Sequence, residues 1–143
     1  MPDIYVVVGD MTHSDDTSKV PLNYRPLVSK TLKAAMTTYL EDAEGFTTKK
    51  PDDGVGYVVS LNLTEIILGF EIQDRPGVKC NLNGSITSIP ANLLITKTLT
   101  GTGTVGGSGK RITESDVTYC LEEAVKKTMK NSILPKLKGL QSP

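Results

Sequence analysis

The chain has few of the residues that build most catalytic and cofactor sites. It contains no tryptophan, two phenylalanines and a single histidine, His13. A mechanism that needs an imidazole must therefore use His13, and no nucleophile motif such as GxSxG accompanies it. We expect a protein that is not an enzyme and that has no cofactor.

The chain has no excess of positive or negative charge, because 16 lysines and arginines balance 16 aspartates and glutamates. A balanced chain is not drawn to phosphate backbones, so we do not expect it to bind nucleic acid. No run approaches the roughly 18 apolar residues of a membrane span. The first residues also lack the basic stretch and apolar core of a signal peptide, so a lipid anchor is expected only if a precursor segment was removed.

Cysteine is scarce as well. Cys80 and Cys120 are too few for a disulfide framework, and they lack the CxxC spacing of zinc or redox sites. We expect two buried thiols that pack as small core residues. A single bridge between Cys80 and Cys120 is the alternative in an oxidising compartment.

The 143 residues fit one domain, with a flexible tail over about 135–143. A continuous apolar run at residues 4–8 predicts a buried strand, and three and four residue spacing over residues 27–43 predicts an amphipathic helix. Alternation of apolar and polar residues predicts strands at 57–64, 78–87 and 93–104. Thr113 and Asp116 form the pattern of a capping box and begin a second helix, which Pro135 is expected to end.

This order of elements, β-α-β-β-β-α, predicts an α+β fold. We expect a two-layer sandwich in which two helices cover one face of a mostly antiparallel, four-stranded sheet. Gly101, Gly103 and Gly106 spell GxGxxG, but they follow a threonine-rich antiparallel strand near the C-terminus and lack the parallel unit of a dinucleotide site. We therefore interpret the tract from Gly101 to Gly109 as a flexible connection between strand and helix.

One polar loop, residues 11–23, follows the first strand and is long enough to be functional. Asp10, His13, Asp15 and Asp16 cluster at its start, and their oxygen and imidazole groups suit a divalent cation. The alternative is a solvated loop whose aspartates and serines cap its own turns.

The chain resembles a group of periplasmic domains that includes the curli secretion lipoprotein CsgG, PelC, LpoB and the N-terminal domain of TolB. The segments that carry this resemblance are IYVVVGDMTHSDD, PLVSKTLKAAMTTYLEDAEGF, GYVVSLNLTEI, LLITKTLTGTGTVGG and ESDVTYCLEEAVKKTMKNSI. The resemblance implies a non-enzymatic, periplasmic or outer-membrane-associated protein. Such proteins are often lipid-anchored, and they assemble into rings or dock on a partner.

We therefore expect a structural or interaction protein of a bacterial envelope assembly. Its partner would be a protein or a second copy of the chain, bound through loop 11–23 and an exposed strand edge, since open edges template pairing. The threonine-rich strand is the favoured edge, with these candidate residues: Leu93, Ile95, Thr96, Thr98 and Thr100. The alternative function is a small-ligand or divalent-metal binding module that uses the loop after the first strand.

Overall fold

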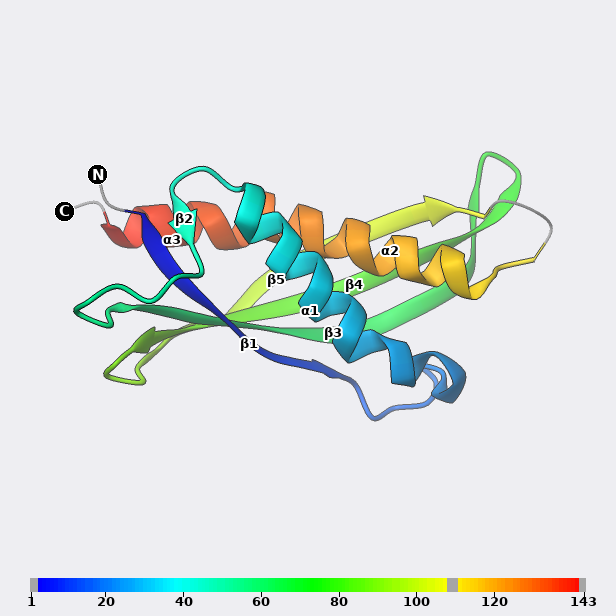
Figure 1. The fold of residues 1–143 in the computed structure, drawn as a ribbon. Helices are drawn as coiled ribbons and strands as arrows, with labels where there is room; N and C mark the ends of the chain where they lie inside the picture. Colours follow the sequence, from blue (N-terminus) through cyan, green and yellow to red (C-terminus); the bar gives the residue numbers. More distant parts are fainter. Residues whose placement is uncertain (1–2, 108–110, 142–143) are drawn as a thin grey trace.

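A five-stranded sheet forms one layer of the protein in the computed structural model, which describes residues 3–107 and 111–141 (Figure 1). The strands lie in the order β2-β1-β3-β4-β5. Their bounds are β1 Ile4–His13, β2 Phe46–Thr47, β3 Gly56–Ile72, β4 Arg75–Ile89 and β5 Leu94–Gly106. The three strands predicted from alternation are confirmed, and each is longer than expected.

The sheet is mixed, so the prediction of a mostly antiparallel, four-stranded sheet is wrong. β1 runs parallel to both β2 and β3, and only the β3–β4 and β4–β5 pairs are antiparallel. The physical reason is the helix α1 (Arg25–Asp42) between β1 and β3, because a helical crossover returns the chain to run in the same direction. The short β2 adds a fifth strand, in which the buried Phe46 pairs with Ile4.

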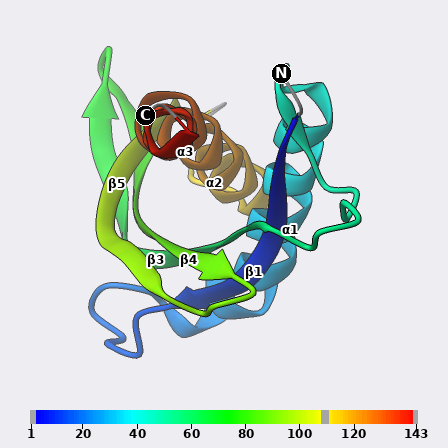
Figure 2. The same ribbon diagram turned by 90° about the vertical axis from the view of Figure 1, so that its left-hand side faces the viewer.

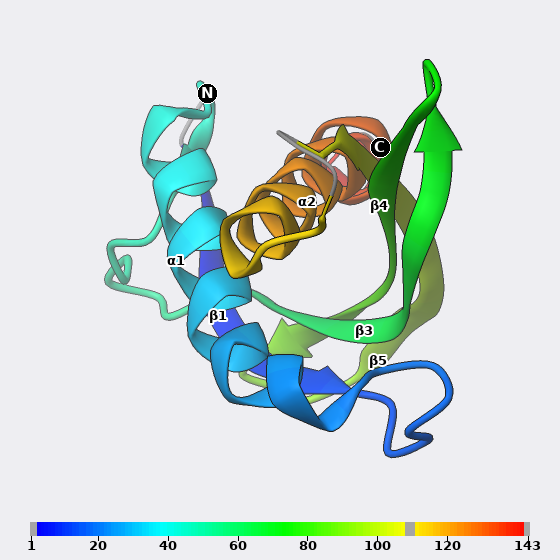
Figure 3. The same cartoon turned by 90° about the vertical axis from the view of Figure 1, so that its right-hand side faces the viewer.

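Helices on one face of the sheet form the second layer, as expected. α1 packs on β1 and on α2 (Glu114–Thr128), and α2 packs mainly on β5 and β4. Figures 2 and 3 show the sheet curving around α2. In the part of the chain that the structure describes, no helix has the length and apolar character needed to cross a membrane.

The C-terminal segment is helical as far as Gln141, where the sequence predicts a flexible tail over about 135–143; residues 142–143 lie outside the described part of the chain. A π-helix, Met129–Ile133, continues α2 directly into α3, Leu134–Gln141. The wider turn changes the hydrogen-bond register just before Pro135, and a proline is tolerated in the first turn of a helix because its missing N–H has no partner there. Leu137 is fully buried, so α3 belongs to the core.

The core lies between the two layers. Inward-facing residues of the sheet, such as Val59, Leu61 and Leu82, meet Leu32 of α1 and Leu121 of α2, and all five are at most 1% exposed. Among the described residues, no helix covers the opposite face of the sheet. Polar residues such as Asn62 of β3, Asn81 of β4 and Thr102 of β5 lie on it, as is usual for a sheet with one solvated face.

Candidate functional site

The free edge of β5 is the candidate site. β5 is the last strand of the sheet, so one of its sides has no neighbouring strand. The hydroxyl of Ser132, which lies in the π-helix, donates to the carbonyl oxygen of Thr100 at 2.8 Å, and the N–H of Thr98 donates to the hydroxyl of Thr96 at 3.4 Å. The N–H of Thr98 and the carbonyl oxygen of Thr100 are thus bonded to side-chain hydroxyl groups. Local contacts satisfy part of this edge, and the rest is open to pairing.

Three consecutive apolar residues are exposed where β5 begins. Leu93, Leu94 and Ile95 expose 62%, 59% and 37% of their surfaces. Single exposed apolar residues are common, but a run of three that leads into an edge strand favours contact with another protein. We call Leu93, Leu94 and Ile95 the apolar tip of β5.

The predicted interaction residues fall on this one edge. Thr98 and Thr100 are exposed, and Thr96 is half-buried. Sequence reasoning missed Leu94, although it is as exposed as its neighbour. The signal was present in the unbroken run Leu93-Leu94-Ile95, which departs from the alternation of the other strands.

The uncovered face of β5 continues a polar surface across the sheet. Thr102 donates to Asn81 Oδ1 at 2.8 Å, and Thr64 donates to the carbonyl oxygen of Asn81 at 3.0 Å. On the same face, Thr12 of β1 donates to Asn62 Oδ1 of β3 at 2.8 Å. These cross-strand bonds hold the solvated face in register up to the free edge.

The inner face of β5 explains its glycines. A Cβ atom built on Gly103 would lie 2.6 Å from the carbonyl oxygen of Cys120 and 2.8 Å from Cα of Ala124, and one on Gly101 would lie 2.8 Å from Cα of Thr128. The glycines therefore let the backbone of α2 approach the strand closely. The interpretation of residues 101–106 as a flexible connection is wrong, since they belong to β5, while residues 108–110 lie outside the described part of the chain.

The four candidate metal ligands do not form a cluster. Within residues 3–107 and 111–141, no group of three or more His, Cys, Asp or Glu side chains could hold a metal ion. Nδ1 of His13 lies 2.9 Å from the carbonyl oxygen of Ser14, so a backbone contact occupies that ring nitrogen. Asp10 and Asp15 are both exposed.

Asp16 is held by its own turn. Its Oδ1 accepts a hydrogen bond from the N–H of Ser18 at 2.9 Å and one from the Ser18 hydroxyl at 2.6 Å. These bonds hold the pKa of the Asp16 carboxyl below its usual value. This geometry is that of the alternative in which the loop caps its own backbone.

Loop 11–23 is also more ordered than a free docking loop. Met11 and His13 belong to β1, and Val20 is fully buried. Beyond β1 the segment still pairs with β3, because the N–H of Ile66 donates to the carbonyl oxygen of Lys19 at 2.8 Å. Of the two surfaces predicted to dock a partner, β5 is the one that lies at the edge of the sheet.

Comparisons with known proteins identify solved structures that share the fold of this chain. No family model matches the chain, and no curated protein matches it. Protein XCC0632 from Xanthomonas campestris, of the family DUF330, has a similar structure, with a TM-score of 0.61 at 14% identity over 98% of this chain and 88% of its own. The hypothetical protein CT253 from Chlamydia trachomatis has a TM-score of 0.52 at 10% identity over 90% of this chain and 99% of its own. At such low sequence identity, the two matches show that the chain shares its fold with XCC0632 and CT253. They give no information about its function.

Proposed function

We propose that the chain is a non-enzymatic interaction protein that associates with a second copy of itself through the free edge of β5. The observation that carries the proposal is the apolar tip, three consecutive exposed residues at the start of a strand that lies at the edge of the described sheet. Adding a strand from another molecule supplies partners for backbone groups that only water or side chains now satisfy. It also covers the exposed side chains of Leu93, Leu94 and Ile95.

A second copy suits this edge because β5 carries little charge. Lys97 is the only charged residue between Leu94 and Gly106. Two β5 strands related by a two-fold axis would run antiparallel, with the same patch on both subunits. The two Lys97 side chains are then the one pair of like charges between the two β5 strands. Strands rich in lysine, in contrast, repel each other and do not pair.

The experiment measures oligomeric state by native mass spectrometry and light scattering over a range of protein concentrations. The unchanged protein should form a discrete oligomer, and Leu94→Lys should shift it toward monomer because the new charge lies at the exposed edge. Tyr119→Lys is the matched control. Tyr119 is 63% exposed on α2, so the control adds the same charge to an equally exposed position away from β5.

Thr98→Pro is a second test of the same edge. Its N–H bonds only weakly, at 3.4 Å to Thr96, so a proline removes an edge donor that adds little to the fold. A monomer at every concentration would refute self-association. An oligomer that tolerates Leu94→Lys and Thr98→Pro but not Tyr119→Lys would place the interface on α2 and refute the β5 edge.

The setting of this assembly, a bacterial envelope with a periplasmic or outer-membrane location, is part of the proposal and is supported by the resemblance to CsgG, PelC, LpoB and TolB domains. Fractionation of cells that produce the full-length native protein tests it. The protein should appear with the periplasmic or outer-membrane fraction. Recovery with the cytoplasmic enzymes would refute the location and leave the test of the β5 edge unaffected.

A further inference from the structure

The two cysteines meet in the core between the helix layer and the sheet. Cys80 lies in the middle of β4 and Cys120 in the first half of α2, and both are 0% exposed. Both are free thiols in the structure. Cys80 and Cys120 are about 40 residues apart in the sequence.

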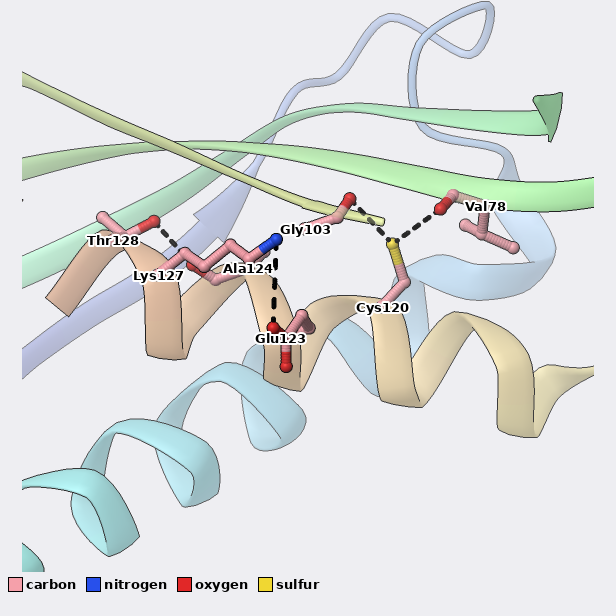
Figure 4. Close-up of polar contacts among 7 residues, drawn as sticks. All are labelled: Val78, Gly103, Cys120, Glu123, Ala124, Lys127 and Thr128. Atoms are coloured by element: carbon pink, nitrogen blue, oxygen red, sulfur yellow. Dashed lines mark hydrogen bonds and ion pairs between the residues drawn. The ribbon is translucent and has the colours of Figure 1, made fainter. Parts of the chain in front are cut away.

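The contacts of Cys120 place its sulfur beside Cys80. Its Sγ donates to the carbonyl oxygens of Val78 and Gly103, each at 3.3 Å (Figure 4). Val78 is the preceding inward-facing residue of β4, and Gly103 is the direct partner of Cys80 in the β4–β5 register. The Cys120 sulfur therefore lies directly above the strand pair to which Cys80 belongs.

Cys120 also affects the titration of the Cys80 thiol. Hydrogen bonding with Cys120 is the largest cause that raises the pKa of Cys80, followed by burial. An effect of this kind acts between neighbouring side chains, in agreement with the position of the Cys120 sulfur beside the partner of Cys80. Gly103 allows the approach, because a Cβ atom at this position would lie 2.6 Å from the Cys120 carbonyl oxygen and would push α2 away from the sheet.

We propose that Cys80 and Cys120 form an intrachain disulfide bond that ties α2 to β4, with a small-molecule disulfide as the oxidant. One cysteine thiolate attacks a sulfur of R–S–S–R, whose bond breaks as the first R–S⁻ leaves. The second thiolate attacks the protein sulfur of this mixed disulfide, forms the Cys80–Cys120 bond and releases the second R–S⁻. The two cysteine protons go to the two released thiolates, so two thiols lose two electrons and R–S–S–R becomes two R–SH.

Burial determines when this bond can form. With both sulfurs at 0% exposure and the thiol form of Cys80 favoured, the native reduced protein reacts slowly with an external disulfide. The chain is open to oxidation before α2 packs on β5. Once formed, the bond is shielded from reductants by the same core.

The experiment refolds the reduced, unfolded chain in a buffer of oxidised and reduced glutathione. The products are quenched with acid, alkylated in denaturant and weighed intact. The refolded chain should carry no alkyl group and should be about 2 Da lighter than the reduced chain. It should also melt roughly 10 °C above the reduced chain, because the bond closes a loop of about 40 residues in the unfolded state.

Single-cysteine variants are the controls, and neither needs to fold. Cys80→Ala and Cys120→Ala each leave one thiol, so each should take up one alkyl group or one glutathione and show no loss of 2 Da. Two alkyl groups on the refolded unchanged chain would overturn the proposal. So would a bond found only between chains, as a dimer on a non-reducing gel. This test does not involve the β5 edge, so its result is independent of whether the chain self-associates.

Discussion

Replacing Gly103 with alanine tests the close packing of α2 on β5. The added Cβ would lie 2.6 Å from the Cys120 carbonyl oxygen and 2.8 Å from Cα of Ala124, whereas ordinary contacts begin at 3.4 Å. Both neighbours are helix backbone, so no side chain can rotate away, and α2 as a whole must move back. The distance to the Cys120 carbonyl oxygen alone requires a shift of about 0.8 Å, and the backbone nitrogen of Ala124 is closer still. A gap of this size loses a quarter to a half of each dispersion contact along the helix.

The expected loss in the free energy of unfolding follows from these numbers. Overpacking of a core costs about 1–3 kcal/mol, with backbone contacts at the upper end. Alanine recovers about 0.5–1 kcal/mol because it loses less chain entropy than glycine in a strand. The net loss for Gly103→Ala is therefore about 2 kcal/mol, out of the roughly 7–20 kcal/mol typical of a chain of this length.

Urea titration of the reduced protein, followed by circular dichroism, measures the effect. Gly106→Ala is the matched control, since Gly106 also lies in β5 but a Cβ atom added there would have no neighbour within 4 Å. The control should be neutral or slightly stabilising. If Gly103→Ala were as stable as Gly106→Ala, with the same dependence on urea, the claim that the glycine admits the helix backbone would be refuted.

Two further predictions concern the helix cap and the buried thiol. Thr113→Ala removes a capping box in which Thr113 Oγ1 accepts from the Asp116 N–H at 3.2 Å, and it should lower the free energy of unfolding by about 1 kcal/mol in urea titration; an unchanged midpoint would contradict it. The raised pKa of Cys80 means that above pH 9.0 the unfolded thiol ionises while the folded one stays protonated, so the reduced protein should lose about 1.4 kcal/mol of stability per pH unit. Cys80→Ala should lack this part of the pH dependence, and an equal slope in both proteins would assign it to other groups.

Much of the fold can be predicted because its signals are local. Val59, Leu61 and Leu63 alternate with polar residues, so β3 is visible in the sequence, and the Thr113 and Asp116 cap is visible for the same reason. β1 extends beyond its predicted end because its register shifts between Val8 and Met11, which breaks the apolar pattern. The parallel pairing follows from the crossover helix and could have been inferred.

Other features depend on contacts between segments far apart in the sequence. Nothing near Gly103 indicates that α2 passes over it, so the glycines resemble a loop. A proline inside a helix usually ends it, so the sequence predicts a stop at Pro135. The chain stays helical because the π-turn before Pro135, which is packed in the core, changes the hydrogen-bond register. The threonine-rich strand is visible because its alternation is local, whereas the clustering of Asp10, His13, Asp15 and Asp16 needs a loop shape that the sequence does not determine.

The mixed sheet has a consequence for the order of folding. The β3–β4 and β4–β5 pairs join neighbours in the chain, whereas β1 meets β3 only through pairs such as Val6 and Tyr57, about 50 residues apart. Pairings distant in sequence form later, because the loop must close first. We expect β1 to dock last, so during synthesis the edge of β3 stands open and is the segment at which newly made chains are most prone to aggregate.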